Sequence, residues 1–137
     1  MKKLIAILFC IAILTSGAKF EKRFKTGIIF NEQPFTKETA NNYSRKFERG
    51  KKIYWLFMSK KDIKAQFIRV QVLRANHKTG FATISGIVYT HEYRINRDTP
   101  HYFTDYFVMH TPGHYYVQIF DMNQLYKPLV IGDFYVR

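Results

Sequence analysis

Residues 66–74 read QFIRVQVLR, and this stretch decides the fold class. Ile68, Val70 and Val72 take every second position, while Arg69 and Gln71 lie between them. That period of two is typical of a β-strand with one buried face and one solvated face. A shift of one residue would bury an arginine and a glutamine in place of aliphatic side chains, so we expect a strongly specified register.

The alternation continues on both sides of this stretch, in short runs of β-branched and aromatic residues. Turn residues separate the runs, as in Thr111-Pro112-Gly113, where Pro and Gly suit the two central positions of a tight turn. No segment supplies the crossover helices that parallel strands need. We therefore expect an all-β, antiparallel two-sheet sandwich of about seven strands. These strands are expected at residues 26–30, 52–58, 66–74, 83–95, 102–110, 114–121 and 129–136.

The segment before this core, residues 19–50, is polar and basic, and the core itself is expected to span residues 51–137. Ala40, Tyr43 and Phe47 have roughly helical spacing, and Gly50 suits the position just after a helix. Asparagine and serine within this stretch favour turns instead. We expect either one short helix or an ordered loop here.

The first 18 residues have the three-part pattern of a signal peptide. Lys2 and Lys3 precede an unbroken apolar run from Leu4 to Leu14, and small residues up to Ala18 suit a peptidase site. The run is shorter than the ~20 residues of a membrane-spanning helix. We expect cleavage after Ala18, no transmembrane segment afterwards, and a periplasmic or extracellular protein. Cys10 would leave with the signal, which excludes disulfides and cysteine-rich metal sites from the mature chain.

Positive charge is concentrated in the first part of this 137-residue chain, which carries 22 Lys and Arg against 10 Asp and Glu. Residues 19–80 hold 16 basic and 5 acidic residues, whereas residues 81–137 hold 4 and 5. The densest cluster comprises Arg45, Lys46, Arg49, Lys51, Lys52, Lys60, Lys61 and Lys64. Export argues against nucleic acid and favours an anionic envelope polymer, a lipid surface or an acidic protein as the partner. The alternative is a solvated lysine-rich surface that keeps a β protein soluble.

Aromatic residues occupy both alternating faces of residues 102–108, so one aromatic face must be partly exposed. Tyr102, Tyr106 and Tyr116 are expected to form an aromatic contact surface for protein or carbohydrate. The alternative is that tyrosine is used here as a good strand residue whose hydroxyl reaches water.

Four residues around the predicted turn at 111–113 could ligate Zn²⁺ or Cu²⁺: His101, Asp105, His110 and His114. They could equally be polar residues on a solvated rim. No metalloprotease, P-loop, dinucleotide or nucleophile-elbow motif occurs in the chain. We expect no cofactor, no metal and no catalysis. A small secreted hydrolase or metal-dependent enzyme built on these four residues is the alternative.

Pro112-Gly113-His114-Tyr115-Tyr116-Val117 resembles the G-x-Y-x-C segment of immunoglobulin-like domains. Val117 stands at the position of the family's cysteine, and Trp55 could fill the role of its core tryptophan. The resemblance covers roughly the last quarter of the chain, and it implies a sandwich without identifying an activity.

Taken together, these patterns predict an exported, single-domain binding or assembly module that recognises an anionic partner through residues 45–64. A homo-oligomer that pairs by its sheet edges is a further alternative.

Overall fold

The computed structural model describes residues 26–36, 38–39, 42–76 and 82–137, with side chains left aside at 82–85. Within these ranges the chain is all-β. The predicted signal peptide lies outside them. Eight strands are formed: β1 (Gly27–Asn31), β2 (Lys46–Phe47), β3 (Lys52–Met58), β4 (Phe67–Ala75), β5 (Ala82–Arg94), β6 (Tyr102–Val108), β7 (Gly113–Asp121) and β8 (Val130–Val136).

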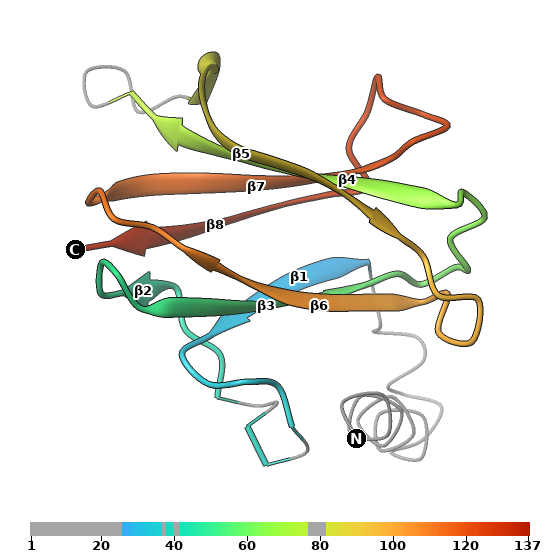
Figure 1. Ribbon diagram of the computed structural model, residues 1–137, viewed down its shortest axis with the longest axis horizontal. Coiled ribbons are helices and arrows are strands. Elements are labelled where there is room, and N and C mark those ends of the chain that lie inside the picture. Colours follow the sequence, from blue (N-terminus) through green and yellow to red (C-terminus); the bar gives the residue numbers. More distant parts are fainter. Residues whose placement is uncertain (1–25, 37, 40–41, 77–81) are drawn as a thin grey trace.

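The strands form two stacked sheets, which Figure 1 shows nearly edge-on. One sheet has three strands in the order β1-β3-β6, and the other has five in the order β2-β8-β7-β4-β5. The predicted two-sheet sandwich is confirmed, and each of the seven expected strands is present with small differences at its ends.

The prediction of wholly antiparallel pairing is wrong at one strand, because β2 pairs with β8 in parallel. Of the two alternatives expected before Gly50, the described residues 42–47 show the loop, which leads into β2, and not the helix. Burial explains the difference: Phe47 packs edge-on against Phe134 in the core, at 6.0 Å between ring centroids. Gly50 does adopt the left-handed conformation (φ 77°), but in the turn that joins β2 to β3 rather than at a helix end.

The core lies between the sheets and follows the predicted alternation. Ile68, Val70 and Val72 are fully buried, and Val70 and Val72 lie opposite Ile119 and Val117 on β7. Trp55 is fully buried on β3, where it stacks on Phe103 and Phe107 at 5.7 and 5.5 Å. Since these side chains come from both sheets, the register predicted from residues 66–74 sets how the layers meet.

The turn at 111–113 carries a tyrosine corner, a side-chain hydrogen bond that immunoglobulin-like domains make from the Tyr of their G-x-Y-x-C segment. The hydroxyl of Tyr115 donates to the carbonyl of Thr111, four residues upstream. Val117, at the family's cysteine position, is fully buried. Apolar packing therefore replaces the cross-sheet disulfide at this point.

Candidate functional site

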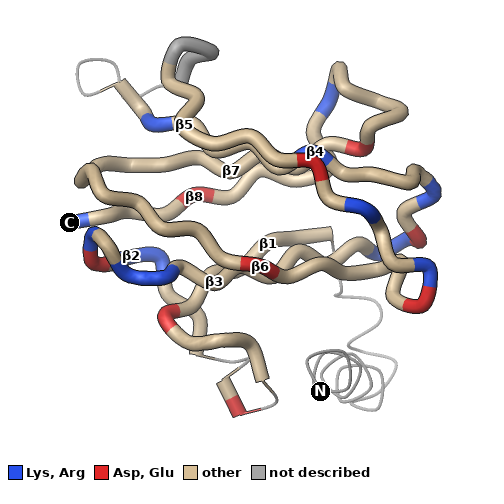
Figure 2. The backbone as a smooth tube through the Cα atoms, in the orientation of Figure 1, with Lys and Arg blue, Asp and Glu red and all other residues tan. Residues whose placement is uncertain are grey.

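The structure divides the predicted basic cluster between the two ends of the sandwich (Figure 2). Arg45, Lys46, Arg49, Lys51 and Lys52 lie around the turn between β2 and β3, and we call them the basic end. Lys60, Lys61 and Lys64 follow β3 at the opposite end, which we call the lysine end. The seven extended residues of β3 separate the two groups by about 20 Å. The single surface predicted over residues 45–64 is therefore two surfaces.

Backbone hydrogen bonds hold the basic end in place. The amide of Gly50 donates to the carbonyl of Met109 at 2.9 Å, and the amide of Arg49 donates to the carbonyl of Arg137 at 3.0 Å. The turn is thereby tied to the segment after β6 and to the end of β8. This arrangement brings in Arg137, a cation that sequence proximity did not indicate.

The cations of the basic end differ in what they bind. Arg137 pairs with Glu48 at 2.7 Å, and Arg45 pairs with Asp133. Lys46, Arg49 and Lys51 are exposed, and no acidic side chain in the described part of the chain forms an ion pair with them. Three cations at this end are therefore available to an external anion.

Asp133 is the acidic centre beside these cations. Its second carboxylate oxygen lies 2.7 Å from Nε2 of His114, whose ring stacks on Tyr135 at 4.1 Å. Partial burial alone would raise the pKa of Asp133, but hydrogen bonds from His114 and Arg45, together with their charge, hold it below its ordinary value. Asp133 thus stays ionised and fixes Arg45 against β8.

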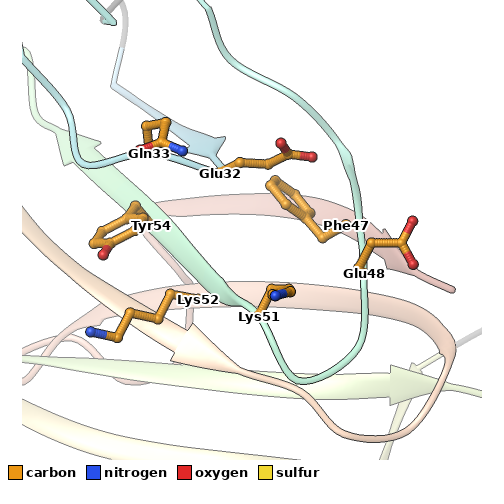
Figure 3. Close-up of a pocket in the computed structure, with 7 residues that line it drawn as sticks. All are labelled: Glu32, Gln33, Phe47, Glu48, Lys51, Lys52 and Tyr54. Atoms are coloured by element: carbon orange, nitrogen blue, oxygen red, sulfur yellow. The ribbon is translucent and has the colours of Figure 1, made fainter.

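A cavity of about 300 Å³ adjoins the basic end. In Figure 3, Glu32 and Gln33 lie on one side of it, and Lys51 and Lys52 lie on the other. Phe47, Glu48 and Tyr54 complete the lining. Its volume is at the lower end of the range for small-ligand sites. The cavity carries both signs of charge, so it does not by itself select an anion.

The basic end continues onto the outer face of the three-stranded sheet. Nζ of Lys52 lies 4.7 Å from the centroid of the Tyr106 ring, and the Tyr54 and Tyr106 rings are 5.9 Å apart. A cation over an aromatic face is held by the ring quadrupole, which keeps the ammonium at the surface. Cations and tyrosines therefore form one continuous exposed region here.

The predicted aromatic contact surface is not one surface. Tyr102 and Tyr106 belong to β6 in the three-stranded sheet, and Tyr116 belongs to β7 in the five-stranded sheet. All three alternate with inward residues of their own strands, so they lie on opposite outer faces of the sandwich. Only Tyr102 and Tyr106 share a face, and Tyr106 contacts the basic end.

The lysine end contains the loop at residues 59–65, and hydrogen bonds from Arg97 hold this loop in place. The guanidinium of Arg97 donates to the carbonyls of Ile63 at 3.0 Å and Lys64 at 3.4 Å, and to that of Ala65. Nearby, Nε2 of His101 lies 2.7 Å from a carboxylate oxygen of Asp62. Neither contact was indicated by the sequence, because residues 59–65 and 95–101 meet only in the folded chain.

The four residues considered as metal ligands do not converge. His101 and His110 lie beyond the two ends of β6, and nine extended residues at about 3.3 Å each separate them by about 30 Å. His114 pairs with Asp133, and Asp105 points inward to Tyr93. Burial raises the pKa of Tyr93, and hydrogen bonds to Tyr89 and Asp105 raise it further. Within the described residues, no group of three or more His, Cys, Asp or Glu side chains could hold a metal ion.

The described part of the chain also contains no helix long and apolar enough to cross a membrane. No protein-family model matches the sequence, and the search of curated proteins found no match. Solved structures do resemble the fold. The soluble domain of PmoD from Methylocystis sp. ATCC 49242 (Rockwell) aligns with a TM-score of 0.50 and 9% identity, over 80% of this chain and 89% of that one.

The CARDB domain of the PF1109 protein from Pyrococcus furiosus, a structure that contains di-metal ions, aligns with a TM-score of 0.40 and 10% identity, over 82% of this chain and 90% of that one. At these identities the likeness concerns the fold alone. The described chain is a two-sheet β-sandwich whose architecture resembles that of the PmoD soluble domain.

Proposed function

We propose that this protein is an exported, non-catalytic binding module whose basic end recognises an anionic envelope component or an acidic protein. One observation carries the proposal. Lys46 in β2, and Arg49 and Lys51 in the turn that follows it, are exposed; backbone hydrogen bonds hold this turn, and no described acid pairs with the three cations. A cation cluster on a rigid turn loses little conformational freedom when it binds, because its backbone is already ordered.

The neighbouring tyrosines extend the proposed contact area. Tyr54 and Tyr106 lie beside Lys52, so a bound chain could place anionic groups on the lysines and an apolar or sugar ring on the phenol faces. Anionic polysaccharides and acidic protein segments both carry anionic groups next to rings or apolar groups. An enzyme built on His101, Asp105, His110 and His114 has no support in this geometry.

The test compares two triple variants that remove the same charge. Lys46→Gln/Arg49→Gln/Lys51→Gln alters the basic end, and Lys60→Gln/Lys61→Gln/Lys64→Gln alters the lysine end. Binding to polygalacturonate, phosphatidylglycerol vesicles and an acidic protein would be measured by titration calorimetry at about 50 and about 500 mM salt. We expect at least about tenfold weaker binding of one of these probes for the first variant, and a much smaller loss for the second.

Two results would contradict the proposal. Equal losses in both variants would mean that net charge alone attracts the anion. Binding that does not weaken in high salt would mean that the contact is not electrostatic, since exposed charges are largely screened at that ionic strength.

A further inference from the structure

The outer face of the five-stranded sheet carries much of the exposed apolar surface of the described chain. Five large side chains on it are well exposed: Phe67, Ile87, Val88, Ile131 and Tyr135. Their placement follows from the register, because Ile131 lies opposite Gln118 and Tyr135 opposite His114, between the buried inward positions. At the other edge a bulge leaves both Ile87 and Val88 against Leu73. Exposed apolar area on one face of a soluble domain marks an interaction site.

This face carries little net charge although the chain is strongly basic. Arg69 pairs with Glu92 at 2.9 Å, and Asp133 pairs with Arg45 and His114. Counting Arg45, Lys46, Arg69 and Arg94 against Glu92 and Asp133 leaves +2 here, compared with +12 for the whole chain. In Figure 2 most Lys and Arg positions lie toward the ends of the molecule, and the charged positions within the five-stranded sheet include acidic ones, for example on β8.

From these observations we infer that two copies of this protein pack through the outer face of the five-stranded sheet. An acidic partner would be drawn to the basic end and would find little charge complementarity over the rest of this face. A second copy brings a face that is equally apolar and carries as little net charge, so the contact meets little charge repulsion. The inference does not depend on the proposed function.

The centre of the face suits a two-fold axis. Nε2 of Gln71 donates to Oε1 of Gln118 at 3.3 Å, in the middle of β4 and β7. A carboxamide has both donors and acceptors left over, so the same pair from a second copy can bond to it. An isologous interface requires such self-complementary groups, whereas a lone charge at the axis would face its own like charge.

The size of the face is also adequate. Four strands at about 4.8 Å spacing and about 27 Å of strand length give a sheet area of roughly 500 Å² before side-chain relief is counted. The loop at 122–129 rises beyond this side of the sheet in Figure 1, and Tyr126 on it is 84% exposed. The sheet face and this loop together approach the area that each partner buries in a stable protein interface, which is about 800 Å².

The experiment is sedimentation equilibrium of the purified protein at several concentrations, at about 50 and about 500 mM salt. We expect the mass to rise with concentration from that of one chain toward twice that value, with no weakening in high salt. Ile131→Asp and Val88→Asp should each raise the dimer dissociation constant by at least about tenfold. Val108→Asp, on the outer face of the other sheet, is the matched control for Val88→Asp and should leave the constant unchanged.

Circular dichroism of each variant confirms that it is folded. A protein that remains monomeric up to about 200 µM, well above typical micromolar affinities, overturns the inference. A dimer that survives both Ile131→Asp and Val88→Asp, or one that dissociates in high salt, overturns it as well, because such a dimer uses another surface.

Discussion

The two ends of the sandwich carry similar groups of basic residues and use them differently. At the lysine end, Arg97 binds three backbone carbonyls and fixes the loop at 59–65. At the basic end, Arg45 and Arg137 bind acids, while Lys46, Arg49 and Lys51 project outward. The comparison shows that a count of charges does not reveal their use. An arginine whose guanidinium binds fixed partners stabilises the fold, whereas a cation without a partner is available to bind a ligand.

The largest effects should come from the apolar side chain that anchors each end. Phe47 and Ile63 are both buried, and they hold the basic end and the loop at 59–65 to the core. Phe47→Ala should lower the free energy of unfolding by about 3–5 kcal/mol and Ile63→Ala by about 2–4 kcal/mol, because each leaves a cavity. Urea unfolding measures both.

The same two variants also distinguish the ends functionally. Under conditions where both are folded, Phe47→Ala should weaken binding of an anionic polymer, whereas Ile63→Ala should leave it unchanged. A weaker affinity in Ile63→Ala alone would reverse the assignment of the binding end.

A smaller effect is expected from arginine-to-lysine changes. Arg97→Lys keeps the charge and loses the fork that reaches three carbonyls, so it should cost about 1–2 kcal/mol and speed amide hydrogen exchange in residues 59–65. Arg49→Lys removes no described side-chain contact and should change stability by less than about 0.5 kcal/mol. Equal costs at the two sites would show that both arginines have the same role.

The smallest effect is a pH dependence located at Asp133. Its folded pKa is lowered, so its contribution is present above the unfolded pKa of about 3.9 and is lost as pH falls through the folded value. Asp133→Asn should therefore lower stability at pH 7 by about 1 kcal/mol, and the difference from the unmodified protein should shrink below pH 4. Denaturant unfolding between pH 3 and 7 measures this.

The matched control is Asp98→Asn, an exposed acid toward the lysine end. Its stability curve should follow that of the unmodified protein across the same range. A constant difference for Asp133→Asn at all pH values would indicate lost packing rather than a lost charge interaction.

Local chemistry explains why much of the fold was predictable. The valines of residues 66–74, the turn at 111–113 and the tyrosine corner each depend on residues close together in the chain. The strand β2 could not be predicted in this way, because its position depends on the packing of Phe47 against Phe134, which is far away in the sequence. Its turn-forming neighbours and loose helical spacing were compatible with either conformation.

The amino-acid sequence alone therefore determined two things: that inward and outward side chains alternate along each strand, and which residues face inward. The tertiary structure decided which outward residues share a surface. Tyr106 and Tyr116 lie on similar strands, but they belong to different sheets, and Lys52 and Lys60 lie at opposite ends of one strand. The physical reason is that side-chain direction is a local, period-two property, whereas sheet membership depends on hydrogen bonds between distant segments.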